Sequence, residues 1–161
     1  MATPALAESI HIEPGALSDL DSVMRIMDSA FSEGLGEAWT RSQLSGILPM
    51  DGVSLMLAWD RDSGEAIGFS LGRTVIDESE LLLIAVRRED HRCGVGRKLL
   101  DHFLGIARAH GVGRIHLEVR DGNPAVAMYR SAGFASVGRR RNYYHAADGR
   151  SFDAITLARQ L

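Results

Sequence analysis

The fold of this chain is indicated most clearly by Glu80-Leu-Leu-Leu-Ile-Ala-Val86, followed by His91-Arg-Cys-Gly-Val-Gly-Arg97 and Lys98-Leu-Leu100. The six consecutive apolar residues from Leu81 to Val86 are too few to cross a membrane, and they predict a strand that is buried on both faces. A polar turn from Arg87 to His91 follows. The stretch therefore predicts a strand, a glycine-rich turn and the start of a helix.

Beyond this turn, apolar residues recur with the 3.6-residue period of a helix and stop before Gly111, which is typical of a helix end. They are Val95, Leu99, Leu100, Phe103, Leu104, Ile106 and Ala107. Gly94 and Gly96 therefore lie at a helix N-terminus, where backbone N–H groups lack partners and the helix dipole is positive. Phosphate oxygens bind at such a place when no Cβ blocks them, and Arg92 and Arg97 add positive charge.

The glycine pair alone does not decide between phosphate binding and a simple connection, because such turns also occur between elements that bind nothing. A Walker loop requires G-x-x-x-x-G-K-[ST], which is absent here. The dinucleotide-binding fingerprint requires a third Gly or Ala where this chain has Leu99. The turn fits neither of these phosphate loops.

Length and composition favour one globular domain over residues 1–161, with no internal repeat. The 18 basic and 21 acidic residues give a net charge of −3, which does not favour general nucleic-acid binding. The start of the chain, Met1 to Ala7, lacks the features of an export signal, and a single cysteine, Cys93, fits a reducing compartment. We therefore expect a cytoplasmic protein with no membrane association and no direct nucleic-acid contact.

The remaining periodicities predict a β-α-α-β-β-β-α-β-α-β-β order. Further strands are expected at 9–12, 54–59, 66–75, 114–120, 136–144 and 152–158, and further helices at 18–34, at about 40–47 and from 123 to 133. In the strand from Arg114 to Arg120, apolar and polar residues alternate. His116, Glu118 and Arg120 are therefore expected to share one face.

This order and the His91–Gly96 turn resemble the GNAT superfamily of acetyl-coenzyme A dependent N-acetyltransferases over nearly the whole chain. Within it, several separated motifs resemble the bacterial ribosomal-protein alanine N-acetyltransferases. They are Asp77–Val86, Leu117–Arg120, Tyr129 with Gly133-Phe134, Arg141–Tyr144 and Asp148–Ile155. The resemblance implies an α+β fold, in which a mixed, twisted central sheet splays open between its fourth and fifth strands and is flanked by four helices.

The resemblance also implies where acetyl-coenzyme A would bind and which residues would act on it. Backbone groups of Ile84, Ala85 and Val86 would hold the pantetheine arm in the splayed gap, with Asn123 at its far end. The pyrophosphate would lie on the N–H groups of Arg92, Cys93, Gly94, Val95, Gly96 and Arg97. The family pattern makes Glu118 the general base and Tyr129 the general acid, and Tyr143 and Tyr144 would line a peptide slot.

These roles agree with the chemistry of acetyl transfer. An α-amino group with a pKa of about 7.7 to 8.0 is largely protonated at neutral pH and must lose a proton before it attacks a thioester. Glu118 would accept this proton, and the phenol of Tyr129 would give the leaving sulfur a proton or a hydrogen bond. A carboxylate is a poor base at its usual pKa of about 4.3, so the cleft would have to raise the pKa of Glu118 by desolvation.

Each of these residues also has a plainer interpretation. Glu118 alone would most often be a solvated charge, and Tyr129 an aromatic that anchors the core. Tyr143 and Tyr144 would most often be ordinary aromatic residues of a strand. The run from Arg139 to Arg141 is typical of a solvated strand face or a phosphate contact. Only the resemblance favours the functional interpretation.

The chain departs from the family pattern at two places. His91 stands where Gln or Arg is usual, which lowers the charge offered to phosphate. The interval from Glu118 to Tyr129 is one residue shorter than expected. One residue turns a helix by about 100°, so Tyr129 would point away from the thiol unless the Asp121–Pro124 turn absorbs the difference.

The leading hypothesis is therefore acetylation of a protein N-terminus that begins with Ala, or with Ser or Thr, such as that of a ribosomal protein. Acetylation of a small amine or a lysine side chain, and an acyl-coenzyme A binding module without catalysis, are the alternatives. No metal site is expected, since the six histidines show no paired ligand spacing. The sequence leaves a monomer and a homodimer equally open.

Overall fold

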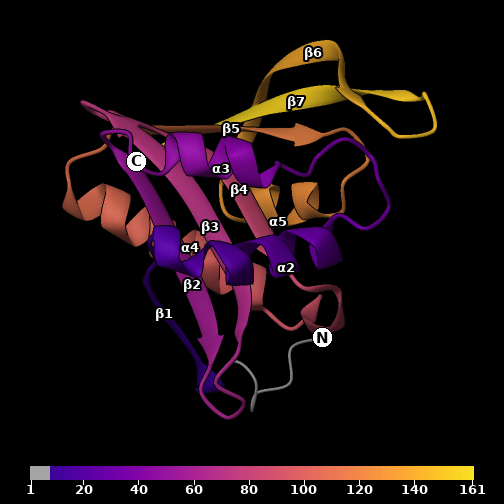
Figure 1. Ribbon diagram of the computed structural model, residues 1–161. Helices are drawn as coiled ribbons and strands as arrows, with labels where there is room; N and C mark the ends of the chain where they lie inside the picture. Colours follow the sequence, from indigo (N-terminus) through magenta and orange to yellow (C-terminus); the bar gives the residue numbers. More distant parts are fainter. Residues whose placement is uncertain (1–7) are drawn as a thin grey trace.

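The computed structural model describes residues 8–161 of the chain, so the segment 1–7, where no export signal is expected, lies outside the described residues. Figure 1 shows the elements in chain order. They are β1 (Ile10–Pro14), η1 (Leu17–Asp19), α2 (Leu20–Ala30), α3 (Arg41–Ile47), β2 (Val53–Asp60), β3 (Ala66–Val75), β4 (Glu78–Val86), η2 (Arg88–Asp90), α4 (Val95–Ala109), β5 (Arg114–Arg120), α5 (Ala125–Ser131), β6 (Ala135–His145) and β7 (Ser151–Gln160). The predicted order of strands and helices is confirmed, with shifts of a few residues at the ends.

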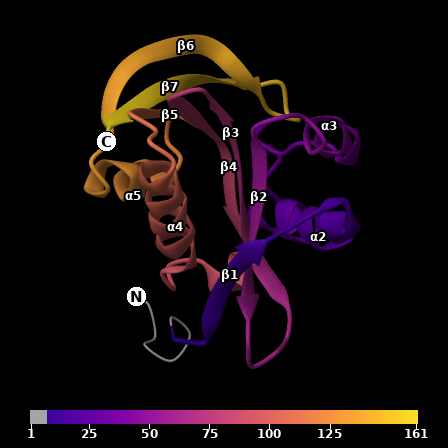
Figure 2. The same ribbon diagram turned by 90° about the vertical axis from the view of Figure 1, so that its left-hand side faces the viewer.

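The seven strands form one sheet in the order β1-β2-β3-β4-β5-β7-β6. Every neighbouring pair is antiparallel except β4 and β5, which are parallel. Figure 2 shows α2 and α3 on one face of the sheet and α4 and α5 on the other. The expected mixed sheet with four flanking helices is therefore confirmed.

The sheet divides between β4 and β5, as expected from the resemblance. The two strands pair only from Glu78 opposite Arg114 to Leu81 opposite Leu117, although β5 stays paired with β7 along its whole length. Leu82 is an extra residue in β4, because Leu71 of β3 faces Leu83 and the next residue of β3 faces Leu81. Such a β-bulge bends its strand and increases the local twist. The bulge lies where β4 leaves β5.

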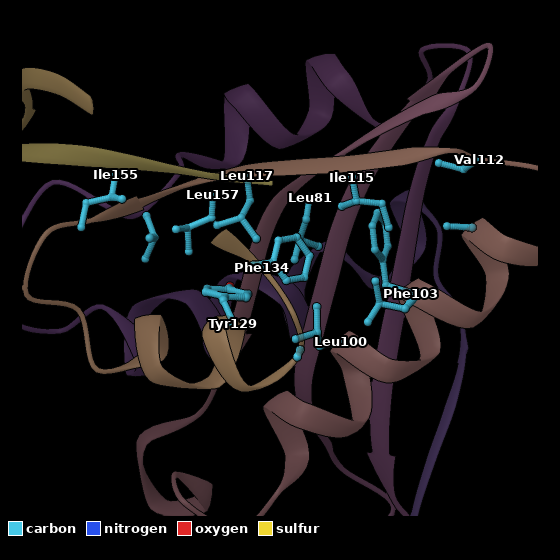
Figure 3. Packing of buried hydrophobic residues seen from close by; sticks show 14 residues of the cluster. Leu81, Leu100, Phe103, Val112, Ile115, Leu117, Tyr129, Phe134, Ile155 and Leu157 are labelled. Carbon is cyan, nitrogen blue, oxygen red and sulfur yellow. The ribbon is translucent and has the colours of Figure 1, made fainter. Parts of the chain in front are cut away.

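Hydrophobic clusters pack on both faces of the sheet beside this division. On the face covered by α4 and α5, buried side chains from β4, β5 and β7 meet residues of the two helices (Figure 3). Leu81 and Leu117, the last pair before the strands separate, are only 2% and 1% exposed. On the other face, a second cluster joins α2 and α3 to β2, β3 and β4. Within residues 8–161, no helix combines the length and the apolar character needed to span a bilayer.

Candidate active site

A cavity of about 390 Å³ opens where β4 and β5 separate. Its walls come from both of these strands, from the α2–α3 loop, from α5 and from β6. They include Leu82, Leu83 and Ile84 of β4, Leu117, Glu118 and Val119 of β5, Glu37 and Trp39 of the loop, Asn123, Tyr129, Tyr143 and Tyr144. The cavity therefore brings together both expected catalytic residues and both expected substrate-binding tyrosines.

Along β4, the backbone N–H and C=O groups of successive residues point alternately toward β3 and toward this gap. The N–H of Arg87 donates to the carbonyl of Ile67 on β3 at 2.9 Å. Because hydrogen bonding alternates along an antiparallel strand, Ala85 also faces β3, whereas Val86 and Ile84 face away from it. Of the three residues expected to hold a pantetheine arm, Ile84 and Val86 thus direct backbone groups toward the gap, and Ala85 does not.

The glycine-rich turn has the predicted position at the start of α4. Gly94 is the N-cap, with a φ of 82° that disfavours residues with a side chain, and Arg92 precedes it with a φ of 60°. The first N–H groups of α4 have no partner inside the helix. Cys93, Val95, Gly96 and Arg97 complete this turn and the first turn of α4. Helix starts of this kind are places where anions can bind.

His91 joins this turn to the end of β4. Its Nε2 lies 2.6 Å from the carbonyl oxygen of Val86, and since a carbonyl only accepts, Nε2 carries the proton. The side chain therefore holds the turn against the end of β4.

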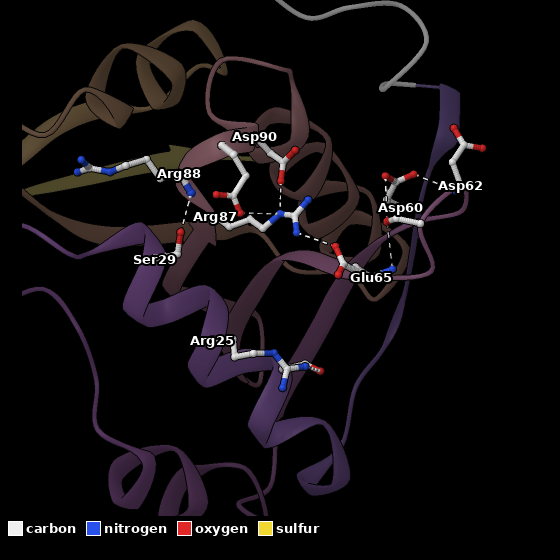
Figure 4. A network of polar contacts seen from close by, with 11 residues as sticks. Arg25, Ser29, Asp60, Asp62, Glu65, Arg87, Arg88 and Asp90 are labelled. Carbon is white, nitrogen blue, oxygen red and sulfur yellow. Dashed lines mark hydrogen bonds and ion pairs between the residues drawn. The ribbon is translucent and has the colours of Figure 1, made fainter.

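Ionic contacts hold the segment between β4 and the turn (Figure 4). Arg87 donates to Asp90 and, at 2.9 Å, to Glu65, while the N–H of Arg88 donates to the Ser29 hydroxyl of α2 at 2.9 Å. The turn is thus attached to the β2–β3 hairpin and to α2. A turn fixed in this way needs little reorganisation when it binds a ligand.

Glu118 lies on β5 at the point where the strands have separated, and its side chain is 19% exposed. One carboxylate oxygen lies 3.0 Å from Nε of Arg140 on β6. Glu118 therefore lines the cavity with most of its side chain covered, and its carboxylate is one half of an ion pair. Any proton that it takes up weakens this pair.

Tyr129 lies on α5, is 6% exposed, and packs edge-on against the ring of Phe134 with 6.0 Å between ring centres. It lines the same cavity as Glu118, so the shorter interval does not turn it away from that cavity. Burial raises the pKa of Tyr129 well above its usual value, with smaller contributions from Tyr144 and Glu37. The side chain is therefore a phenol at all physiological pH values.

Tyr143 and Tyr144 both line the cavity because β6 is irregular. In a regular strand, two consecutive side chains point to opposite faces. Here Arg140 faces Ala154 and Tyr144 faces Phe152, so that three residues of β6 are opposite a single residue of β7. In the middle of this bulge Asn142 has a φ of 50°, and its N–H donates to Asp153 at 3.0 Å.

Sequence reasoning missed Glu37, a loop residue of the cavity wall. Its carboxylate accepts from Nε of Arg120 at 2.9 Å and from Nδ2 of Asn123 at 2.6 Å. Asn123 therefore lies at the cavity as expected, but its amide nitrogen already binds a protein carboxylate. Loop residues follow no periodicity, and the only signal for this one was a carboxylate next to Gly36.

The buried phenols predict how stability depends on alkaline pH. Burial raises the pKa of Tyr144 as well as that of Tyr129. In the unfolded chain both phenols ionise near pH 10, so the free energy of unfolding is unaffected below about pH 10 and falls as the pH rises toward the raised pKa values. Urea unfolding at about pH 9 and about pH 11 should show a smaller loss in Tyr129→Phe than in the wild type. Equal losses in the two proteins would contradict this prediction.

Comparison with known proteins gives a family. The sequence profile of the acetyltransferase (GNAT) family matches residues 20–134. The [ribosomal protein bS18]-alanine N-acetyltransferase of Escherichia coli K12 is 42% identical over 97 residues, which are 60% of this chain and 65% of that protein. The N-alpha-acetyltransferase RimI of Mycobacterium tuberculosis is 40% identical over 104 residues, 62% of each chain. The match thus covers slightly less than two thirds of the length of these relatives.

Solved structures give a longer match. The crystal structure of the ribosomal-protein-S18-alanine N-acetyltransferase from Escherichia coli superimposes with a TM-score of 0.84 at 30% identity, over 94% of this chain and 93% of that chain. Arabidopsis thaliana NAA60 in complex with acetyl-CoA superimposes with a TM-score of 0.81 over 94% of this chain and 98% of that chain. At 19% identity, the second match establishes a shared fold only.

Proposed function

Because this chain belongs to the GNAT family of acetyltransferases, we propose that it transfers the acetyl group of acetyl-coenzyme A to the α-amino group at a protein N-terminus. One observation carries the proposal: a single cavity joins the division of the sheet to Glu118, Tyr129 and the two tyrosines of β6. The acceptor is a terminus that begins with alanine, such as that of a ribosomal protein, as the names of the relatives suggest.

Acetyl-coenzyme A suits the residues on both sides of the division. The diphosphate lies on the N–H groups at the start of α4, where Gly94 and Gly96 carry no Cβ that would hinder it. The pantetheine arm would take the place of a strand partner beside β4, bonding to the backbone groups of Ile84 and to the N–H of Val86, whose carbonyl already accepts from His91. The thioester then lies near the cavity.

The cavity residues divide the chemistry between them. Glu118 takes a proton from the ammonium group, and the free amine attacks the thioester carbonyl. Backbone N–H groups of β4 stabilise the oxyanion that forms. When the C–S bond breaks, the nitrogen would lose its second proton and the departing thiolate would take it up, while Tyr129 donates a hydrogen bond to the sulfur. Its raised pKa favours this over full transfer of its proton, because a thiolate is a much weaker base than such a phenolate.

Charge at the cavity favours a cationic acceptor. Glu37, Glu80 and Glu118 all line it. Glu37 and Glu118 are paired with Arg120 and Arg140, whereas Glu80 has no arginine partner among the described residues and can attract an ammonium group. Tyr143 and Tyr144, whose rings meet edge-on with 5.0 Å between centres, provide an apolar wall next to these carboxylates. A peptide N-terminus supplies both a charge and a chain that can lie along such a wall.

An assay of coenzyme A release tests the proposed function. The purified chain is incubated with acetyl-coenzyme A and a peptide that begins with Ala, and mass spectrometry locates the acetyl group. We expect release with this peptide and none with the same peptide carrying an N-terminal acetyl group and an internal lysine. Faster release with lysine or a small amine would assign the enzyme to another acceptor. Tight binding of acetyl-coenzyme A without turnover would indicate a binding module.

A further inference from the structure

Glu37 is a buried acid that joins three separate parts of the cavity wall. Its side chain is 11% exposed, and that of Arg120 beside it is 10% exposed. One carboxylate oxygen accepts from Arg120 at the end of β5, and the other accepts from Asn123 in the turn before α5. Removal of one partner from such a buried pair leaves the other charge uncompensated, which is costly.

The contact with Asn123 controls the start of α5. The side-chain oxygen of Asn123 accepts from the N–H of Ala125, the first residue of α5, at 2.8 Å. That bond occupies the oxygen and leaves the NH₂ group to face residue 37, which must therefore be an acceptor. Glu37 thus holds the amide in the orientation that fixes the first turn of α5. Tyr129 lies one helical turn further on.

The loop that carries Glu37 is attached on its other side as well. Gly36 has a φ of 87°, and a Cβ on it would lie 2.5 Å from the carbonyl oxygen of His145 at the end of β6. The N–H of Ala147 donates to the carbonyl of Gly34 at 2.9 Å. The loop is therefore held between the β6–β7 hairpin and the turn before α5. Glu37 makes the second of these attachments.

We propose that Glu37 is a positioning residue, a role that presupposes the acetyl transfer proposed above: as the shared acceptor of Arg120 and Asn123, it fixes the first turn of α5 and so aims the Tyr129 phenol into the cavity. In this role Glu37 touches neither the acceptor nitrogen nor the thioester carbon. It affects kcat indirectly, through Asn123 and the position of α5.

This role is tested by moving the carboxylate from position 37 to position 123. In Glu37→Gln, the amide has one oxygen for two donors, so either Arg120 or Asn123 loses its acceptor. In the double variant Glu37→Gln with Asn123→Asp, the new amide donates to the new carboxylate, which can still accept from Ala125. The net charge is that of the wild type. The single variant Asn123→Asp completes the cycle: it places a carboxylate opposite Glu37, so two like charges face each other and the contact is lost.

Two readouts are measured for each protein: the hydrogen exchange rate of the Ala125 amide, and kcat with an Ala peptide. We expect both single variants to exchange Ala125 faster and to lose roughly ten- to hundredfold in kcat, which is typical of a small misplacement at a reacting centre. The double variant should recover both quantities. The interaction between the two positions is then measured by a double-mutant cycle.

The outcomes separate this role from the proposed function. Unchanged exchange in Glu37→Gln, or no recovery in the double variant, would overturn the role. Faster exchange with unchanged kcat would show that the contact holds α5 without aiming Tyr129, which also overturns it. If the wild type acetylates no peptide at all, the proposed function fails, and the exchange rate alone decides whether Glu37 fixes α5.

Discussion

Replacing Glu118 by Gln is expected to lower kcat by about 10² to 10⁴ while acetyl-coenzyme A binding stays unchanged. Gln keeps the size of the side chain and one hydrogen-bond acceptor but takes up no proton at neutral pH. The α-amino group, with a pKa of about 7.7 to 8.0, then reacts only through its deprotonated fraction. The activity of Glu118→Gln should therefore rise as the pH rises through about 8, as measured by initial rates from about pH 6.5 to pH 9.

The ion pair between Glu118 and Arg140 requires a control, because Glu118→Gln also removes it. Arg140→Gln breaks the same contact but leaves the carboxylate in place. Its side chain is 58% exposed, so little stability should be lost. We expect Arg140→Gln to keep most of the wild-type kcat. An equal loss in both variants would assign the effect to the ion pair and would count against Glu118 as the base.

Replacing Leu117 by Ala is expected to cost about 2 to 5 kcal/mol of unfolding free energy. Leu117 is 1% exposed, and it faces Leu81 across the last paired position of β4 and β5 and Leu157 across β7. A cavity at this place weakens the packing that joins the two halves of the sheet. The melting temperature should fall by roughly 4 to 20 °C in calorimetry or thermal unfolding followed by circular dichroism.

Val137→Ala provides the matched comparison for this loss. Val137 lies on β6 and is 57% exposed, so its truncation should change the unfolding free energy by less than about 0.5 kcal/mol. If Leu117→Ala lowered the unfolding free energy no more than Val137→Ala does, this would contradict the view that packing at the division of the sheet joins its two halves.

The sequence predicted the elements around the division of the sheet because their patterns are local. Six consecutive apolar residues predicted β4, and apolar residues with a helical period that end before Gly111 predicted α4. The division itself was expected only from the family resemblance. The extra residue Leu82 lies where the strands separate, and its presence depends on the register with β3, which no local pattern encodes.

Some residues of the site were predicted from motifs, and others were not because they depend on contacts between distant parts of the chain. Glu118 and Tyr129 were placed by motif, and the structure brings them to one cavity. The common orientation of Tyr143 and Tyr144 could not be predicted from strand alternation, because it depends on a bulge that Asp153 of the neighbouring strand stabilises. Glu37 was missed for a similar reason: its partners are more than 80 positions away along the chain. Their roles in catalysis and binding stay predictions.

The bulge in β6 also changes the backbone along one edge of the sheet. β6 is the outermost strand next to β7, and eleven residues of it would otherwise offer unpaired backbone groups to another chain. The turn of the backbone at Asn142 interrupts that row. Arg139 and Arg140 lie on the same strand and are held by ion pairs with Asp121, Asp153 and Glu118. A strand edge that is interrupted by a bulge and carries charged side chains is a poor template for pairing with another chain.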